Sequence, residues 1–453
     1  MGGDWVRMTP DREPQTADSR RRLYAILAAI AVLALFIRLA AVAYFRTYDL
    51  GLEHDHWPFG FDAGRIARSL AQGQGFASPH FEPSGPTALL APAFPFLMAG
   101  IFRVLGVYTR ESALAIYFFD SLLSALTCLV LYRLGERIFG AKVGLAAALA
   151  FALYPPAIWH AAATIWDTTL SAFAMVSLMA WLYCLPRRPR TGQLVQTGLL
   201  MGLVALVNPV PLMFYPIVAL VIWFRLRDQG LRALLATAVL TASCALVVLP
   251  WMVRNAVTVG AFTPRTCIGM SLWRGNNPAA WKAQDGAFQF NMSPDESPAE
   301  GRIFDQLGEV GYDHRCARIA MEFIRANPGK FAVLTLVRAR AWWFGQSSEF
   351  SGNLKTKIRL AVLKRIVFLV PLPFLVIGCA AAWRRRKSVG LLLAFLAVYP
   401  LAYYVSFVME RYRFPTEPFM VLLETYGAFV FVSFIRGLRR SPTACDSGLP
   451  LAL

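Results

Sequence analysis

The chain has 453 residues, of which 57% are hydrophobic and 16% are charged. This composition excludes an ordinary soluble globular protein and is typical of a helical membrane protein with several spans. The net charge of +18 would suggest a nucleic-acid partner in a soluble protein. Here the basic residues cluster in short loops between apolar runs, which indicates membrane topology and no nucleic-acid partner.

The apolar runs predict the membrane spans. A helix needs roughly 20 residues to cross a hydrocarbon core of about 30 Å. The ten runs that approach or reach this length lie at residues 23–44, 114–132, 143–159, 170–185, 194–207, 211–224, 234–253, 366–383, 391–408 and 419–435. We therefore expect an all-α polytopic membrane protein of about 10 to 12 transmembrane helices, with amphipathic helices and loops on the outer side.

Both ends of the chain are expected to lie outside a membrane domain of residues 23–440. The run at 23–44 is longer than a signal-peptide core and lacks a cleavage site, so it should remain as the first span. Residues 1–22 and 441–453 are then an N-terminal and a C-terminal tail.

Lysine and arginine in the short loops predict the orientation, because cytoplasmic loops are enriched in them. With ten spans, the basic clusters all fall on one side of the membrane, so both termini are predicted to be cytoplasmic. These clusters lie within residues 20–22, 133–142, 187–190, 225–232, 384–387 and 436–440.

Two further apolar stretches must not cross the membrane if this orientation is to hold. Residues 331–344 combine two arginines with two tryptophans, which suits a helix lying in the membrane interface. Residues 89–104 contain Pro92 and Pro95, and the sequence leaves open whether this stretch is re-entrant or a short span.

The predicted outer face is built from four segments, at residues 46–88, 160–167, 254–330 and 409–415. The large segment 254–330 is predicted to be rich in loops, with a helix over residues 312–327. It holds Cys267 and Cys316, which could pair in an oxidising compartment, and two free thiols are the alternative.

An acid follows the first predicted span. Asp62 stands in Gly-Phe-Asp-Ala-Gly-Arg-Ile-Ala-Arg, ahead of a short amphipathic turn that carries Arg65 and Arg68. An acid held just outside a span is a candidate for chemistry at the membrane surface, and the alternative is an ordinary solvated loop acid.

Three more acids lie at or within predicted spans, where each is a functional hypothesis. Asp167, in Trp-Asp-Thr-Thr-Leu, sits at the outer end of the fourth span, level with Asp62. It could serve the same site or cap a helix. Asp120 and Glu424 are expected to pair inside the bundle.

Arginines on the predicted outer side are candidates for binding a phosphate group. Arg411 and Arg413 lie in the link Met-Glu-Arg-Tyr-Arg, where orientation does not require them, and Arg254 leaves the membrane at the same level. Arginine offers a planar fork of donors that suits phosphate. The alternative for Arg254 is an interfacial anchor.

Histidines and acids on the same side could hold a divalent ion, although no spacing matches a recognised site. They are His54, His56 and His160, with Glu53, Asp55 or Asp167. We assign no metal ligands from the sequence. No Walker loop and no Gly-rich dinucleotide motif occurs, so a soluble nucleotide is not the expected donor.

The order of these features resembles the GT-C glycosyltransferases, in the branch of the dolichyl-phosphate-mannose protein mannosyltransferases and the lipid A aminoarabinose transferases. The motifs that carry the resemblance are Arg-Ile-Ala-Arg-Ser-Leu-Ala-Gln-Gly-Gln-Gly-Phe after the first acid, Gly-Pro-Thr-Ala-Leu-Leu-Ala-Pro-Ala-Phe-Pro-Phe, Trp-Asp-Thr-Thr-Leu, Pro-Trp-Met-Val-Arg-Asn, Leu-Trp-Arg-Gly-Asn-Asn-Pro and Glu-Arg-Tyr-Arg-Phe-Pro. They extend over nearly the whole chain, from about residue 23 to residue 440.

The resemblance implies roles for the candidate residues. An outer-loop carboxylate acts as catalytic base in this family, a second acid lies in the next outer loop, and basic residues bind the lipid phosphate. By position the acids are Asp62 and Asp167, and the phosphate-binding residues are Arg254, Arg411, Arg413 and Arg65.

The chain departs from the family pattern at the first acid. The commoner pattern there is an Asp-Glu pair, whereas Asp62 is flanked by Phe61 and Ala63, so Asp55 is the reserve candidate. A large soluble C-terminal domain is also lacking in this sequence.

The expected activity is the inverting transfer of a sugar from a polyprenyl-phosphate donor to a lipid, glycan or protein acceptor. It would take place on the periplasmic side of the cell inner membrane. Such a donor carries its own leaving group, so the protein must supply a base, positive charge for the phosphate and a groove for the prenyl chain. The alternative is a secondary transporter or lipid flippase, which would place ionisable groups near the membrane midplane within inverted repeats.

Overall fold

The computed structural model describes residues 17–49, 59–80, 83–283, 292–295, 297–345, 362 and 365–439. Within these residues the chain forms helices and no strand, and one isolated antiparallel bridge pairs Ala77 with Pro86. The helices are α1 (Ala17–Phe45), α2 (Asp62–Ala71), α3 (Ala93–Leu105), α4 (Arg110–Phe139), α5 (Ala141–Ala152), α6 (Pro155–Ala162), α7 (Thr168–Cys184), α8 (Thr191–Val207), η2 (Val210–Phe214), α9 (Tyr215–Leu226), η3 (Arg227–Gln229), α10 (Leu231–Thr258), α11 (Ile268–Gly275), α12 (Pro278–Ala283), α13 (Pro298–Ala326), α14 (Pro328–Phe344), α16 (Leu372–Arg384), α17 (Gly390–Val398), α18 (Leu401–Val405), α19 (Glu410–Arg413), η5 (Phe414–Thr416) and α20 (Glu417–Arg439).

The predicted spans all fall on helices. Six helical segments in the described residues are long and apolar enough to cross a membrane, at Ala17–Phe45, Arg110–Phe139, Val210–Gln229, Leu231–Thr258, Arg365–Arg384 and Glu410–Arg436. The pair α5 and α6, bent by 50°, makes a seventh. Shorter apolar helices at Thr168–Cys184, Thr191–Val207 and Gly390–Val405 account for the other predicted runs. The chain is therefore a helical membrane protein with several spans, as predicted.

The two stretches left out of the predicted spans are also helical. Most of residues 89–104 lie in α3, which begins only at Ala93 and whose 13 residues extend about 20 Å at 1.5 Å per residue, well short of the hydrocarbon core. Residues 331–344 lie in α14, which is not among the helices apolar enough to span. Its Arg338 is buried and donates hydrogen bonds to the backbone oxygens of Gly275 and Tyr404.

Small residues let neighbouring helices approach closely. A Cβ placed on Gly198 of α8 would lie 2.5 Å from the backbone oxygen of Leu240 in α10, and one on Gly427 of α20 would lie 1.9 Å from that of Phe374 in α16. Glycine is therefore required at both contacts, because close backbone packing replaces the hydrophobic drive that lipid cannot supply.

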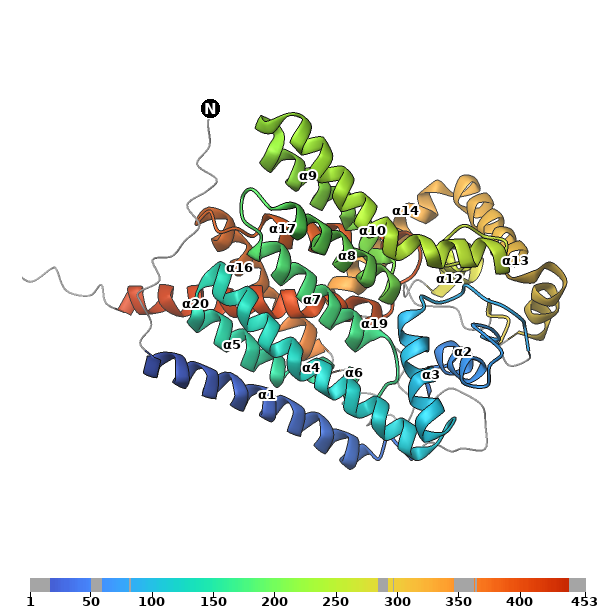
Figure 1. Ribbon diagram of the computed structural model, residues 1–453, viewed down its shortest axis with the longest axis horizontal. Helices are drawn as coiled ribbons and strands as arrows, with labels where there is room; N and C mark the ends of the chain where they lie inside the picture. The colour runs from blue at the N-terminus through green and yellow to red at the C-terminus, as the bar shows by residue number, and fades with distance from the viewer. Residues whose placement is uncertain are drawn as a thin grey trace, which may run out of the picture.

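The outer segments gather at one end of the bundle. Figure 1 shows α2, α3, α12 and α13 together at the end opposite to that at which α1 begins and α20 finishes. We call the end that carries α2, α3, α12 and α13 the site end. The start of α1 and the end of α20, which border the predicted tails, therefore lie at the other end of the bundle.

The prediction that residues 254–330 are rich in loops is wrong for the part described. The segment is largely helical, with the end of α10, then α11, α12 and α13. The predicted helix at 312–327 lies within α13, which begins after Ser297, whose side chain accepts a hydrogen bond from the backbone N–H of Glu300. Cys267 and Cys316 are both free thiols, so the suggested disulfide is not formed.

A buried arginine holds the break between α5 and α6. Arg38 of α1 is fully buried, and its guanidinium donates to the backbone oxygens of Ala152 at 2.9 Å and Phe151 at 3.3 Å, and to the Ser124 hydroxyl at 2.7 Å. The carbonyl of Ala152 has no helical partner at the bend, because Pro156, four residues later, has no N–H, and an unsatisfied carbonyl is costly in an apolar interior. Arg38 thus stabilises the broken span.

We expect Arg38→Met to lower the free energy of unfolding by about 2 to 4 kcal/mol, because it leaves the buried carbonyl of Ala152 without the donor that Arg38 supplies. Thermal denaturation of the purified protein in detergent measures the effect. Arg21→Met, at an exposed position near the start of α1, is the matched control. Equal melting temperatures for the two variants would show that Arg38 does not hold the bend.

Candidate active site

A cavity of about 610 Å³ opens at the site end. Its lining comes from α2, from the loop before α7, from the turn after α8, from residues 263–274 and 293–295, and from the segment that joins α18 to α20. Asp62 and Asp167 both line it. The four segments predicted to form the outer face therefore meet at one place.

A glycine brings the two acids to the same cavity. Gly60 has φ +79°, and a Cβ there would lie 2.2 Å from the backbone oxygen of Ile165. Only glycine accepts both this backbone conformation and this contact. The next residue, Phe61, also has a positive φ of 56°, which is strained for a bulky side chain. The chain enters α2 at Asp62 with its backbone against the loop that leads to Asp167.

Burial and neighbouring charges set the protonation of Asp62. The pKa of Asp62 is raised above its ordinary value, chiefly by burial and further by the negative charge of Asp295. His80, Arg65 and Arg274 act in the opposite direction and offset part of this rise. A carboxylate with a raised pKa is a stronger base than a solvated one, which suits it to accept a proton.

Asp167 occupies the N-cap position of α7 but does not act as a cap. Its side chain makes no capping hydrogen bond to the backbone, and it accepts a weak hydrogen bond from the Ser171 hydroxyl at 3.5 Å. Burial raises the pKa of Asp167, and the positive charges of Arg265 and Arg411 partly offset the rise. Asp167 therefore faces the cavity with two cations near it.

Arg411 is the predicted phosphate-binding arginine that lines the cavity. Its guanidinium lies 4.3 Å from the centre of the Trp166 ring, and its Nη2 donates to the Tyr412 hydroxyl at 3.2 Å. Its Nε is buried and has no hydrogen-bond partner among the described residues. These contacts hold the side chain in place and leave it a donor for an anion in the cavity.

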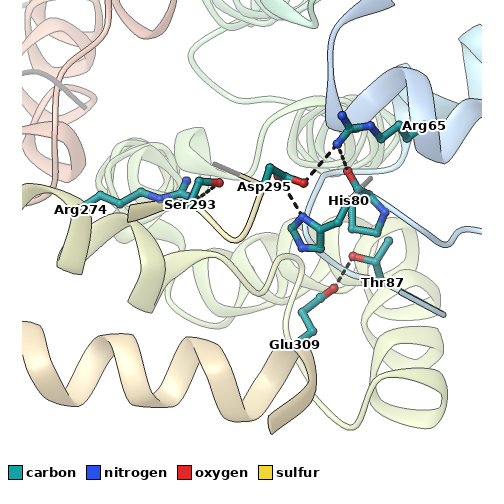
Figure 2. Close-up of polar contacts among 8 residues, drawn as sticks. Arg65, His80, Thr87, Arg274, Ser293, Asp295 and Glu309 are labelled. Atoms are coloured by element: carbon teal, nitrogen blue, oxygen red, sulfur yellow. Dashed lines mark hydrogen bonds and ion pairs between the residues drawn. The ribbon is translucent and has the colours of Figure 1, made fainter. Parts of the chain in front are cut away.

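The cavity is also lined by two arginines that sequence reasoning did not single out. Arg265 donates from Nε to the backbone oxygen of Leu89 at 2.8 Å, and Arg274 donates to the Ser293 hydroxyl at 3.0 Å (Figure 2). Arg274 stands in the motif Leu-Trp-Arg-Gly-Asn-Asn-Pro, which the resemblance had already drawn attention to. Arg265 carried no comparable signal.

The other three predicted phosphate-binding arginines support the walls and do not line the cavity. Arg254 donates to the backbone oxygens of Phe76 and Thr87, Arg413 lies 3.7 Å from Glu417, and Arg65 lies 3.3 Å from Asp295. Because these guanidinium groups bind carbonyls and carboxylates of the protein, their geometry favours a scaffold role.

The remaining candidates lie outside the cavity lining. Asp120 is fully buried without a hydrogen-bond partner among the described residues, so the expectation that it pairs inside the bundle is wrong. Arg413 forms its ion pair with Glu417 and acts on Glu424 only at longer range, so the pairing of Glu424 stays a prediction. His160 is buried in α6 and packs against Phe414.

A metal site is not formed by the part of the chain that the structure describes. No group of three or more histidine, cysteine, aspartate or glutamate side chains there could hold a metal ion. His54, His56, Glu53 and the reserve acid Asp55 lie outside the described residues.

A buried glutamate joins three of the segments around the cavity. Glu309 accepts a hydrogen bond from the Thr87 hydroxyl (Figure 2). It also accepts hydrogen bonds from the Thr266 hydroxyl and from the backbone N–H of Ala88. It follows Gly308, whose non-helical backbone kinks α13 at this point. The carboxylate fixes Thr266, and hence the neighbouring Arg265, against the loop that Arg254 also holds.

We expect Glu309→Gln to lower the free energy of unfolding by about 2 kcal/mol. Three groups donate hydrogen bonds to the Glu309 carboxylate, and the NH₂ group of a glutamine would face one of these donors and lose that hydrogen bond. Thermal denaturation compares it with Glu322→Gln, at an exposed position of the same helix. If Glu309→Gln is as stable as that control, the carboxylate is not what joins these segments.

Comparison with known proteins bears on the fold. Residues 88–253 match the family model of the dolichyl-phosphate-mannose-protein mannosyltransferases. Archaeal oligosaccharyltransferase AglB from Archaeoglobus fulgidus, solved in complex with an inhibitory peptide and a dolichol-phosphate, is 14% identical and aligns with a TM-score of 0.50. The alignment covers 95% of this chain and 53% of AglB, so the chain spans about half the length of that protein.

A bacterial structure aligns over more of its own length but less closely. ArnT from Cupriavidus metallidurans, bound to undecaprenyl phosphate, is 16% identical with a TM-score of 0.39, and the alignment covers 95% of this chain and 83% of ArnT. Curated protein sequences give no match. The family model and the alignment with AglB confirm the predicted resemblance: the chain is a polytopic membrane protein with the fold of the GT-C glycosyltransferases.

Proposed function

We propose that the protein is a membrane glycosyltransferase that transfers a sugar from a polyprenyl-phosphate donor to an acceptor. The observation that supports this most is the cavity at the site end, where two acids with raised pKa values face several arginines. AglB, with which the chain shares its fold, is described in complex with a dolichol-phosphate. A chain of this fold with such a cavity suits the same class of donor.

Asp62 is the proposed base. It takes the proton of the acceptor hydroxyl while the hydroxyl oxygen bonds to the anomeric carbon and the bond from that carbon to the phosphate oxygen breaks. The bonding electrons leave with the phosphate, so no strong general acid is needed. A single displacement of this kind inverts the anomeric carbon. Asp167, at the end of the loop before α7, supports the sugar or the acceptor.

Arg411 and Arg265 are the proposed phosphate ligands. Both line the cavity, and both act electrostatically on Asp167. Charge on the departing phosphate increases during the reaction, and fixed guanidinium groups in a partly desolvated cavity stabilise it. Of the four arginines that the sequence analysis named as phosphate ligands, we keep only Arg411. The other three, Arg254, Arg413 and Arg65, have partners in the scaffold. Arg274 stands on the Asp62 side and suits the acceptor.

The prenyl chain needs an apolar path beside the cavity. An open, almost wholly apolar groove of about 570 Å³ lies between α3, α8 and α10, and Val207 lines both this groove and the cavity. Trp251 and Arg254 also line the groove. We assign the groove to the first isoprene units of the donor.

The proposed setting is the cell inner membrane, with both tails cytoplasmic and the cavity facing the periplasm. Residues 23–440 would form one catalytic membrane domain. The acids of the cavity lie at one end of the bundle, whereas a transporter or flippase would hold its ionisable groups near the midplane. No observation in the described residues favours that alternative.

We expect Asp62→Asn to reduce sugar transfer by about 100-fold or more, because the amide cannot accept the proton. Wild-type transfer should also fall as the pH is lowered through the raised pKa of Asp62, since only the ionised acid is a base. Purified protein in liposomes, incubated with polyprenyl-phosphate sugars, gives the rates by mass spectrometry of the acceptor fraction. Asp305→Asn, at an exposed position of α13, is the control. Full activity of Asp62→Asn would discard the assignment.

We expect Arg411→Gln and Arg265→Gln each to weaken donor binding and to lower kcat/KM for the donor by about 10-fold to 100-fold, the loss of one charge-assisted contact to phosphate. The same liposome assay with varied donor concentration measures both constants. Arg302→Gln, at an exposed position of α13, should behave like the wild type. Unchanged kinetics in both cavity variants would place the phosphate elsewhere.

A further inference from the structure

We propose that His80 is a second proton acceptor in this site, which takes the proton from Asp62 after transfer, and that Asp295 positions it. The inference rests on the proposed function of the cavity. His80 and Asp295 both line the cavity together with Asp62. Neither belongs to the motifs that the sequence analysis singled out.

The hydrogen bonds fix which ring nitrogen carries a proton. The Nδ1 atom of His80 lies 3.0 Å from Oδ2 of Asp295, whose Oδ1 lies 3.3 Å from Nη1 of Arg65 (Figure 2). A carboxylate that is also paired with an arginine accepts hydrogen bonds, so Nδ1 of a neutral His80 donates. Nε2 then carries the lone pair and is the atom that can accept a proton.

The proton-accepting nitrogen has no partner within the described residues. The residue His80 as a whole is only 9% exposed, and its Nε2 is buried without a hydrogen-bond partner. Buried polar atoms in proteins are nearly always satisfied, and exceptions point to a ligand, a water molecule or a catalytic role. The ring is held by the edge of Phe304, 4.5 Å away between ring centres.

Charged groups from several elements surround His80. Asp295 lies against Nδ1, and Asp62 is within electrostatic reach, since His80 affects its pKa. Arg65 of α2 is paired with Asp295, and Arg274 of α11 acts on Asp62. On α13, which supplies Phe304, the carboxylate of Glu309 is held by Thr87 and Thr266. Asp295 is therefore the carboxylate that directly stabilises an imidazolium at this position.

The proton balance of the step is simple. The acceptor hydroxyl gives its proton to Asp62 during transfer, and Asp62 becomes neutral. His80 takes this proton on Nε2 through one bridging water molecule, which returns Asp62 to the ionised form. The imidazolium then releases the proton to solvent. An imidazole suits this task because it gains and loses a proton near neutral pH.

Variants of the pair test the assignment through the pH dependence of transfer. We expect His80→Gln to lower kcat by about 10-fold to 100-fold, the usual range for loss of one proton-transfer group. In the wild type the logarithm of the rate should fall at acidic pH with a slope approaching two, because Asp62 and His80 must both be unprotonated. In His80→Gln the slope should fall to one. Asp295→Asn should also lower kcat while keeping the steeper slope, since the ring loses the carboxylate that orients it through Nδ1.

A readout that does not depend on activity accompanies the kinetics. In protein labelled with ¹⁵N-histidine, the His80 signals, assigned by their loss in His80→Gln, should show a neutral ring protonated at Nδ1. Asp295→Asn should shift these signals. His314→Gln, at an exposed position of α13, is the control for both measurements and should leave rates, slopes and the His80 signals unchanged.

Two outcomes would overturn the proposal. Equal slopes in the wild type and in His80→Gln, or a neutral ring protonated at Nε2, would leave His80 as a packing residue only. Failure of the proposed function looks different, because the wild type itself would then transfer no sugar and Asp62→Asn would change nothing. In that case the ¹⁵N-histidine signals would still show which ring nitrogen of His80 carries the proton.

Discussion

The close contact between the backbone at Gly60 and the carbonyl of Ile165 is the constraint on which the cavity depends. It ties the segment after the first span to the loop before α7, which are far apart in the sequence. Asp62 follows Gly60 by two residues, and Asp167 follows Ile165 by two. Any side chain at position 60 would separate these backbones. Two acids from different spans therefore face one cavity because one residue lacks a Cβ.

Arginine has two roles in this membrane protein, and burial separates them. Arg38 and Arg338 lie fully inside the bundle and donate to backbone oxygens that broken or short helices leave unpaired. Arg265 and Arg411 line the cavity, with aromatic or backbone contacts that use only part of their donor capacity. The first pair stabilises irregular helices in an apolar medium, where an unpaired carbonyl is costly. The second pair is available to a ligand.

Several parts of the site could be predicted from the sequence because the bilayer restricts where polar residues occur. A charged residue in a loop beside an apolar run is conspicuous, which is why Asp62, Asp167 and Arg411 could be predicted. His80 and Asp295 were missed because each lies in a polar segment of the outer face, where such residues are common. Their importance comes from a hydrogen bond across 215 positions of sequence.

The sequence alone determined that the chain is a bundle of membrane helices, since only long apolar runs satisfy the backbone inside lipid. It also determined on which segments the polar chemistry lies. Only the tertiary structure decided which arginines reach the cavity, because Arg254 and Arg265 look alike in sequence but bind different partners. The helical form of residues 254–330 was likewise decided by packing, since α11 and α13 bury a small apolar core of their own that local composition does not reveal.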